Sequence, residues 1–343
     1  MDRALELARS HHPHPNPRVG AVVVSPSGRV IGEGAHRRAG TDHAEVVALS
    51  RAGEAARGAT LYVTLEPCAH QGRTPPCVEA IIAAGVSKVV VAAVDPDPRV
   101  SGRGLTRLAE AGIEIVEGVG AEKARDADPA YFHHRETGLP LVTLKYAMTL
   151  DGAVAALDGS SRWISGAEAR RDAHRLRAEV DAVVIGAGTL RSDDPILTVR
   201  LESDEGHQPV PVVVAGTGPL PDSARLWERD PVVIAVDSFD LPRGRMVRVE
   251  GSEGLPDPVA ACRALADLGH LALLVEGGPR LAAAWWNAGV VSRGVVYVAG
   301  RMAGGAGISP LAERFETIAD AEEVRIHRVR TLGGDLRIDF ERM

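Results

Sequence analysis

Four residues of this chain have types and a spacing that could do chemistry together: His43, Glu45, Cys68 and Cys77. One imidazole and two thiolates make a three-ligand set suited to zinc, which leaves one coordination position for a water molecule. Glu45 follows His43 by two residues, so its carboxylate is expected beside that water and not on the metal. The set therefore predicts a metal-assisted hydrolytic reaction. The competing interpretation is two unrelated buried thiols and a core histidine.

The order of these residues is that of the zinc deaminases, in which a His-x-Glu segment precedes a Pro-Cys segment and a second cysteine. In those enzymes the glutamate acts as general acid and base while water replaces an amino group on a ring carbon. Here eight residues, 69–76, separate the two cysteines, in place of the usual two.

This longer spacing resembles that of the RibD family, the bifunctional deaminase/reductases of riboflavin biosynthesis. In the first half the resemblance is carried by residues 14–20 (HPNPRVG), 43–45 (HAE), 67–77 (PCAHQGRTPPC) and 95–100 (DPDPRV) with Gly102. It continues through residues 145–152 (KYAMTLDG), 161–164 (SRWI), 176–177 (LR), 186–189 (GAGT), 193–200 (DDPILTVR) and 276–278 (EGG). The resemblance thus covers essentially the whole chain.

Membership would imply an α/β chain with a cytidine-deaminase-like α/β/α domain, followed by a dihydrofolate-reductase-like α/β domain. The first domain would hold one zinc ion on His43, Cys68 and Cys77, with Glu45 as the catalytic residue. It would deaminate a 2,5-diamino-6-ribosylamino-pyrimidinone 5′-phosphate. The second domain would use NADPH to reduce the ribosyl side chain to ribityl.

The resemblance also implies the contacts of each ligand. NADPH is expected at Ala147, Trp163, Thr189, Asp193, Gly278, Pro279 and Arg280. The ribosyl phosphate is expected at Ser161, Arg177, Leu197, Arg200 and Glu276, and the deaminase substrate at Asn16 and His70.

The physical chemistry of several of these residues is compatible with those roles. Two arginines can bracket a phosphate dianion with forked hydrogen bonds. Residues 275–279 (VEGGP) end an apolar strand and open a helix, and free N–H groups at a helix start suit a phosphate. The alternatives are a solvated helix face for Arg177, a core anchor for Trp163 and a surface ion pair for Arg200. The dinucleotide fingerprint G-x-G-x-x-G is absent at Gly277–Gly278, which argues against a standard Rossmann domain.

Four residues depart from the family pattern. Ala153 stands where a basic residue is common, and Asp97 stands where asparagine is common. Asp128 and Tyr131 occupy the places of an Asn-x-x-Phe segment. Ala153 bears on NADPH affinity and Asp97 on how the pyrimidine ring is held, and neither belongs to the zinc set.

Composition restricts the class of protein. A length of 343 residues is typical of two domains. The net charge of −7 argues against broad binding of nucleic acids or anionic membranes, which requires a basic face. Of three cysteines, two are assigned to the metal, and the remaining Cys262 indicates a reducing cytoplasm. Residues 1–8 read as an amphipathic helix and not as a signal peptide, and no apolar run is long enough to span a bilayer.

The elements that would position these residues alternate between strand and helix, which predicts α/β domains. In the first half, strands are expected at 20–25, 30–34, 59–65, 88–94 and 113–116, in a mixed or parallel sheet. Helices are expected at 43–52, 77–84 and 104–111, which would place His43 and Glu45 in a first helical turn. A linker is expected near 128–140, because Asp128-Pro129 interrupts a helix and Gly138-Leu139-Pro140 precedes a new strand.

In the second half, strands are expected at 141–148, 181–186, 210–215, 231–236, 271–275 and 295–299. A helix is expected at 280–288 and a terminal hairpin at 325–341. The predicted domains are therefore 1–139, a zinc-dependent pyrimidine deaminase, and 140–343, an NADPH-dependent reductase. We expect a cytoplasmic homo-oligomer that acts on a small molecule.

Two other functions remain open at this point. A nucleoside or tRNA-type deaminase with an unrelated accessory domain would share the zinc set. A non-enzymatic module with a structural zinc would need a fourth ligand, which His70 or His36 could supply.

Overall fold

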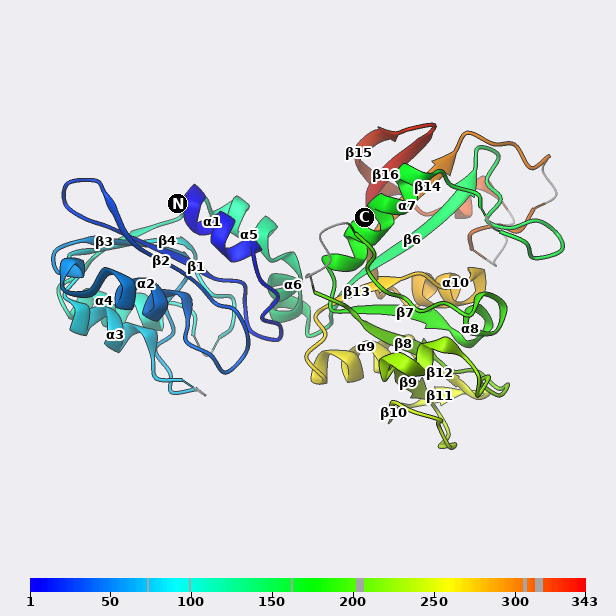
Figure 1. Cartoon of the computed structure of the whole chain (residues 1–343), viewed down its shortest axis with the longest axis horizontal. Coiled ribbons are helices and arrows are strands. Elements are labelled where there is room, and N and C mark those ends of the chain that lie inside the picture. The colour runs from blue at the N-terminus through cyan, green and yellow to red at the C-terminus, as the bar shows by residue number, and fades with distance from the viewer. Residues whose placement is uncertain (73, 99, 162, 202–206, 305–306, 312–316) are drawn as a thin grey trace. The chain divides into compact units, whose positions relative to one another are not determined.

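The structure is a computed structural model that describes residues 1–343 except 73, 99, 162, 202–206, 305–306 and 312–316. Arg73, Arg99 and Arg162, which belong to the family motifs, therefore lie outside the described residues. The chain divides into two compact units, Met1–Gly138 and Leu139–Met343 (Figure 1). In the described part of the chain, no helix has the length and apolar character needed to cross a membrane.

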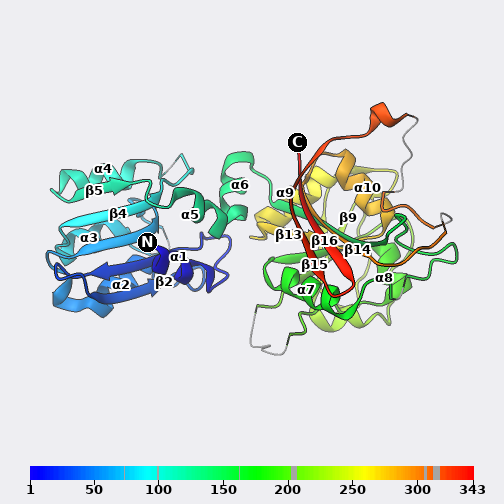
Figure 2. The same cartoon turned by 90° about the horizontal axis from the view of Figure 1, so that it is seen from above.

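The first unit is built on a five-stranded mixed sheet. Its strands are β1 (Gly20–Val24), β2 (Val30–Ala35), β3 (Thr60–Leu65), β4 (Lys88–Ala93) and β5 (Glu114–Glu117), in the order β2-β1-β3-β4-β5 (Figure 2). Strand β1 pairs antiparallel with β2 and β3, whereas β3, β4 and β5 run parallel. The central strands are rich in valine, which suits a sheet covered on both faces.

Helices cover both faces of this sheet and make the α/β/α arrangement that the resemblance predicts. Helices α2 (Ala44–Ala52), α3 (Cys77–Ala84) and α4 (Arg103–Glu110) lie on one face (Figure 1). Helices α1 (Asp2–Arg9) and α5 (Ala121–Ala127) lie on the other. A short 3-10 turn, η1 (Gly53–Ala56), follows α2.

Helix α2 packs unusually close to strand β2, because β2 contains two glycines. A Cβ atom on Gly34 would lie 2.1 Å from the carbonyl oxygen of Ala44, and one on Gly32 would lie 2.1 Å from that of Ala48. Only glycine at both positions lets the helix backbone rest on the strand backbone. The close approach sets the position of the start of α2, which carries His43 and Glu45.

The segment expected to be a linker is instead mostly helical and belongs to the first unit. Helix α6 (Pro129–Thr137) begins after Asp128, whose side chain accepts a hydrogen bond from Tyr131 N, and ends at Gly138 with φ 74°. An aspartate cap, a proline in the first turn and a left-handed glycine are standard helix boundary signals. The prediction of a linker was wrong because Asp128-Pro129 starts a new helix, with Tyr131 and Phe132 buried.

The second unit is built on a nine-stranded sheet. Its strands are β6 (Leu141–Thr149), β7 (Ala182–Gly186), β8 (Val210–Val214), β9 (Val232–Ala235), β10 (Arg245–Arg248), β13 (Ala272–Val275), β14 (Val291–Ala299), β15 (Val324–Leu332) and β16 (Asp335–Arg342). Their order is β10-β9-β8-β7-β13-β6-β14-β16-β15, with every pairing parallel except β14–β16 and β16–β15. The predicted terminal hairpin is confirmed, and β11 (Gly251–Ser252) and β12 (Leu255–Pro256) form a separate small ribbon.

Alternation along β14 shows how both faces of this sheet are covered. Val296 and Val298 join the core cluster that includes Trp285 of α10 (Pro279–Asn287) and residues of α9 (Pro258–Asp267). The intervening Tyr297 donates its hydroxyl to Asp172 of α7 (Ala167–Ala178) at 2.8 Å. The remaining short elements are α8 (Ala187–Asp193), η2 (Arg225–Arg229) and η3 (Ile318–Asp320).

Cys262 lies within that core cluster and has no disulfide partner, as predicted. Burial raises the pKa of its thiol to about 12, so it behaves as a small apolar side chain and not as a nucleophile.

We predict that α6 is needed for the stability of the first unit. A fragment of residues 1–138 should unfold cooperatively, whereas a fragment of residues 1–127 should lose roughly 3–5 kcal/mol, the usual cost of removing a buried aromatic side chain. Urea titration monitored by circular dichroism measures both, and a fragment of residues 139–343 should fold by itself. Equal stability of the two N-terminal fragments would mean that α6 is only a connector.

Candidate functional site

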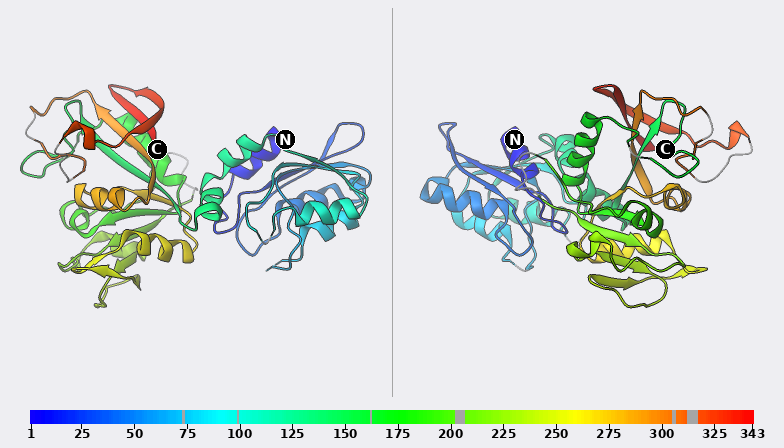
Figure 3. Two further views of the ribbon diagram at one scale, coloured as in Figure 1. Left: turned by 180° about the vertical axis from the view of Figure 1, so that it is seen from behind. Right: turned by 45° about the vertical axis from the view of Figure 1, so that its right-hand side comes forward.

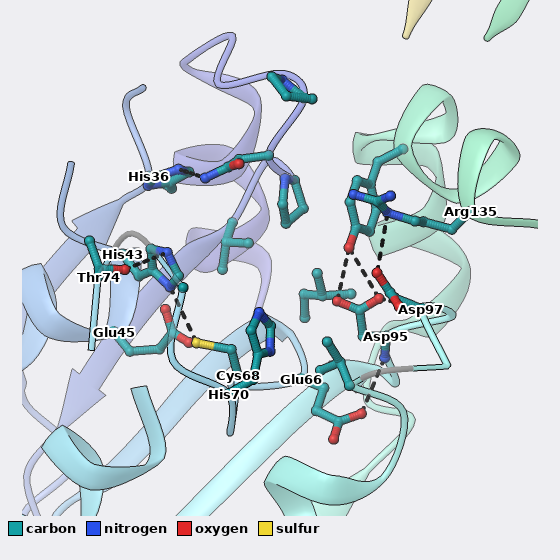
Figure 4. Close-up of a pocket in the computed structure, with 18 of the residues that line it drawn as sticks. His36, His43, Glu45, Glu66, Cys68, His70, Thr74, Asp95, Asp97 and Arg135 are labelled. Carbon is teal, nitrogen blue, oxygen red and sulfur yellow. Dashed lines mark hydrogen bonds and ion pairs between the residues drawn. The ribbon is translucent and has the colours of Figure 1, made fainter. Parts of the chain in front are cut away.

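The predicted metal ligands come together in the first unit. His43 Nδ1 lies 3.0 Å from Cys77 Sγ and 3.6 Å from Cys68 Sγ. The three ligand atoms lie within 4.8 Å of one another. The other ring nitrogen, Nε2, contacts Thr74 Oγ1 at 3.2 Å, so Nδ1 is the atom that faces the thiols (Figure 4).

Two helix starts and one strand end bring these ligands together. His43 is the residue that caps α2, in extended conformation, and not a residue of its first turn as predicted. Cys77 is the first residue of α3, and its N–H points at Cys68 Sγ over 3.4 Å. The hydrogen bond from the Cys77 thiol lowers the pKa of Cys68 to about 4. The hydrogen bond from the Cys77 N–H, at the start of α3, also lowers this pKa, and the thiolate is the form that binds a metal.

Glu45 lies beside the metal group without belonging to it. It occupies the first turn of α2, is only 3% exposed and lines the same pocket. Burial raises the pKa of its carboxyl above the usual range. A carboxyl that ionises nearer neutral pH can both take up and release a proton during a reaction.

The donor set fits zinc with one position left open. One imidazole and two thiols are ligands that zinc prefers, and the described residues supply three and not four. His36 is not a fourth ligand, because its Nε2 contacts Asn16 Nδ2 at 3.0 Å and its Nδ1 contacts the carbonyl of Asp42 at 3.1 Å. This geometry argues against a purely structural zinc site.

A pocket of about 330 Å³ opens over the metal group. Asn16 and His70, the predicted substrate contacts of this unit, both line it. The hydrogen bond between Asn16 and His36 holds the amide at the pocket wall (Figure 4).

The opposite wall of the pocket contains two residues that depart from the family pattern. Asp97 is buried and its carboxylate lies 3.8 Å from Arg135 Nε. Tyr131 donates its hydroxyl to Asp95 at 3.0 and 3.1 Å, and the Arg135 guanidinium lies over the Tyr131 ring, 4.9 Å from its centre. Helix α6 thus supplies this wall with a phenol and a cation (Figure 4).

Glu66 shapes the same pocket and was missed by sequence reasoning. Its buried carboxylate accepts hydrogen bonds from the N–H groups of Asp95 (3.3 Å), Gly102 (2.9 Å) and Gly104 (2.9 Å). These bonds hold the loop that carries Asp95 and Asp97. A glutamate directly before Pro67-Cys68 was the available signal, but nothing in the sequence shows which backbone would meet it.

In the second unit, a pocket of about 740 Å³ gathers most of the residues predicted from the resemblance. Those that line it are Ala147, Ser161, Trp163, Arg177, Thr189, Asp193, Leu197, Arg200, Glu276, Gly278 and Pro279. Arg280 is exposed and is not among the lining residues. Sequence reasoning missed Lys145, Arg170 and His174 as individual lining residues.

Glu276 is the charged centre of this second pocket. Its carboxylate accepts hydrogen bonds from Arg177 Nε (2.7 Å) and Nη2 (3.0 Å) and from Lys145 Nζ (3.4 Å). Burial alone would raise the pKa of Glu276, but the two cations outweigh it and lower the pKa well below the usual range. Arg177 is therefore not on a solvated helix face, and its forked donors are directed at Glu276 and not into open space.

The start of helix α10 can accept a cofactor close to its backbone. Gly278 caps this helix with φ −69°, so its backbone does not require glycine. A Cβ atom there would meet only Thr189 Oγ1, at 3.6 Å, so the chain's own packing does not require glycine either. Gly278 N–H donates to that hydroxyl at 3.1 Å. Neither the backbone conformation nor the packing therefore requires glycine at this helix start, where the missing side chain lets a phosphate group approach the backbone. The pocket fits a nucleotide cofactor.

Three further positions decide between the alternatives left open. Trp163 is 62% exposed and stacks on Arg170 at 4.6 Å, so the core-anchor interpretation is wrong. Arg200 contacts His174 Nε2 at 3.3 Å, a hydrogen bond and not an ion pair. Ala153 is buried and lies outside the residues that line the pocket.

Sequence comparisons divide the chain in the same way. The cytidine and deoxycytidylate deaminase zinc-binding region matches residues 1–93, and the RibD C-terminal domain matches residues 140–338. A zinc-dependent deaminase site and a reductase-type domain on one chain define a bifunctional enzyme. The chain belongs to the RibD family, which excludes an unrelated accessory domain.

Individual relatives agree over the full length. The chain is 43% identical to the riboflavin biosynthesis protein RibD of Aquifex aeolicus, over all of this chain and 97% of that protein. It is 40% identical to RibD of Escherichia coli, over 98% of this chain and 96% of that protein. The solved structure of Acinetobacter baumannii RibD superposes with a TM-score of 0.92 at 35% identity, covering 100% of this chain and 97% of that one.

We predict that Glu45 and Cys68 fail in different ways. Glu45→Gln should keep one zinc ion per chain and lower the rate of ammonia release by roughly 10²–10⁴-fold, because a general acid and base is lost. Cys68→Ser should lose the zinc itself, since a ligand is removed. Metal analysis and an ammonia assay distinguish the two, and loss of zinc from the Glu45 variant would contradict the assignment.

Proposed function

We propose that this chain carries out two consecutive steps of riboflavin biosynthesis on a small-molecule substrate. The first is hydrolytic deamination of 2,5-diamino-6-ribosylamino-4(3H)-pyrimidinone 5′-phosphate. The second is reduction of the ribosyl side chain, which gives 5-amino-6-ribitylamino-uracil 5′-phosphate. Residues 1–139 are assigned to the deaminase and residues 140–343 to the reductase. The observation that carries the proposal is the His43, Cys68 and Cys77 group with Glu45 beside it, on one chain with the second pocket.

In the deaminase, His43, Cys68 and Cys77 would hold zinc, which would make a water molecule acidic enough to attack near neutral pH. Glu45 takes a proton from the attacking water and passes it to the ring nitrogen and then to the departing amine. The amine-bearing carbon thereby exchanges nitrogen for oxygen, and ammonia leaves. Asn16 and His70 hold the ring and its substituents from the pocket wall.

In the reductase, the residues around Gly278 would hold NADPH, which would supply the hydride. Ala147, Trp163, Thr189, Asp193 and Pro279 complete this side of the pocket. Ser161, Leu197 and Arg200 hold the ribosyl phosphate. Arg177 acts indirectly, by holding the Glu276 carboxylate, because its Nε and Nη2 already donate hydrogen bonds to that carboxylate. The task of the chain is to orient C1′ of the opened ribose toward the hydride donor.

The zinc site also bears on where the enzyme works. Both ligand cysteines must stay reduced to bind a metal, and all three cysteines are free. We therefore assign the protein to a reducing compartment, the cytoplasm.

We predict that mass measurement separates the two steps and the two ligand sides. Without NADPH, the substrate should exchange its amine for oxygen. With NADPH, it should also gain two hydrogens. Arg200→Ala should weaken binding of the ribosyl phosphate by about ten- to a hundredfold, the cost of a charge-assisted hydrogen bond, and leave NADPH affinity unchanged. Gly278→Val should do the reverse.

The two variants serve as controls for each other in calorimetric titrations with each ligand. Equal losses for both ligands in both variants would mean that the second unit has unfolded. Absence of any deamination without NADPH would contradict the assignment of the first step to the zinc site.

We also propose that the chain is a homo-oligomer that pairs through strand β15. This strand is the last in the nine-stranded sheet, and the hairpin that it makes with β16 is drawn in red (Figure 3). Its Ile326 and Val329 are 58% and 56% exposed. A long edge strand with exposed apolar side chains is a ready template for pairing.

Light scattering should therefore give a multiple of the chain mass. Ile326→Lys should reduce that multiple, because a charge on the edge opposes strand pairing. A monomeric unmodified chain would contradict this proposal and leave the two activities standing.

A further inference from the structure

The segment that carries Leu197 and Arg200 contains a strained backbone turn. Leu197 has φ 57°, in the left-handed region that is unfavourable for a residue with a side chain, and its side chain is buried. Pro195, Ile196, Leu197 and Arg200 all line the pocket of the second unit. Strained residues persist only where their surroundings hold them, and they concentrate at functional sites.

Cationic and imidazole donors hold the carbonyl groups of this turn. Thr198 O contacts Arg177 Nη1 at 3.0 Å and His174 Nδ1 at 3.2 Å. On the other side, Arg229 Nη1 donates to Leu197 O at 3.1 Å and to Ile196 O at 3.4 Å. The carbonyl groups of residues 196–198 therefore all accept hydrogen bonds from side chains of α7 or η2.

Arg229 also contacts the segment that leads into β8. Its Nη2 donates to Pro209 O at 2.9 Å, next to the start of β8. Gln208 makes two hydrogen bonds with the backbone of Val199. Its Oε1 accepts from Val199 N at 2.9 Å, and its Nε2 donates to Val199 O at 3.2 Å. The turn and the approach to β8 are therefore held as one piece, with Arg229 at its back.

Among the described residues, the hydrogen bonds of the Arg229 guanidinium all go to backbone carbonyl groups. Within the part of the chain that the structure describes, Arg229 makes no ion pair, whereas its neighbour Asp230 pairs with Arg243. Arg229 is not among the residues that line the pocket. Its element is anchored by the buried Leu226 and Trp227, the latter donating Nε1 to Pro221 O at 2.8 Å. Arg229 is half-buried, and a guanidinium with five donors in a planar fork can bind several carbonyl groups at once, which a lysine cannot.

We propose that Arg229 is a positioning residue of the reductase: it holds the left-handed turn at Leu197 so that Arg200 is presented to the substrate's phosphate. The inference rests on the proposed function of this pocket. Without Arg229, Leu197 can relax to negative φ and redirect the residues that follow it. The NADPH side is carried by Thr189 in α8 and Gly278 at α10, whereas the Arg229 hydrogen bonds go to residues 196, 197 and 209. Loss of Arg229 should therefore act on one ligand only.

The test is Arg229→Met in the full-length zinc-loaded protein, titrated separately with the deaminated ribosyl phosphate and with NADPH. Substrate affinity should fall about tenfold, as for the loss of a charge-assisted hydrogen bond, and NADPH affinity should change less than about twofold. Arg229→Lys, which keeps the charge but not the fork, should recover only part of the loss. Arg243→Met removes a neighbouring exposed arginine and should leave both affinities unchanged.

A second background tests whether backbone strain is the link. Glycine adopts positive φ without cost. Arg229→Met should therefore lower substrate affinity by a smaller factor in a Leu197→Gly chain than in the unmodified chain. Three outcomes would overturn the proposal: the same loss of substrate affinity in both backgrounds, equal losses of NADPH and substrate affinity, or no loss of affinity at all. An unmodified chain that binds NADPH and reduces its substrate keeps the proposed function intact in all three cases.

Discussion

Buried carboxylates determine how several loops and helices of this protein are positioned. A buried carboxylate is costly unless hydrogen-bond donors surround it, so the chain must bring donors to wherever one is buried. Glu66 collects three N–H groups in the first unit, and Glu276 collects Arg177 and Lys145 in the second. Each carboxylate lines a pocket together with residues that it collects: Asp95 in the first unit, and Arg177 and Lys145 in the second. The requirement for donors thus determines loop positions that no local preference would determine.

Asp128 and Asp181 apply the same constraint to the framework. Asp128 caps α6 and also receives Arg18 N at 2.7 Å and His14 Nε2 at 2.9 Å, which joins the N-terminal loop to that helix. Asp181 accepts the N–H groups of Leu271 and Ala272, both at 2.8 Å, and so aligns β7 with β13. The first contact places Asn16 at the deaminase pocket, and the second brings Gly186 and Glu276 to the same end of neighbouring parallel strands.

Both pockets lie where parallel strands end, which is the usual place for a site in an α/β sheet. Cys68 and Asp95 follow the neighbouring strands β3 and β4 in the first unit. The departures at Asp97 and Tyr131 also fall there, and the cation of Arg135 accompanies them on the same wall. A carboxylate in place of an amide needs a compensating charge when it is buried, so the substitutions are physically consistent as a group.

The sequence by itself determined the α/β class, most strands of both sheets, the three metal donors with Glu45, and the glycine at the start of α10. These depend on residue type, short spacing and hydrophobic period, which are local properties. Tertiary structure alone decided that helix 129–137 packs into the first unit, that Arg177 binds Glu276, and that Arg229 lies behind Leu197. Each of those contacts joins residues that are far apart in the chain. Packing determines which partner satisfies a buried charge or a strained turn, and short-range sequence patterns do not encode that packing.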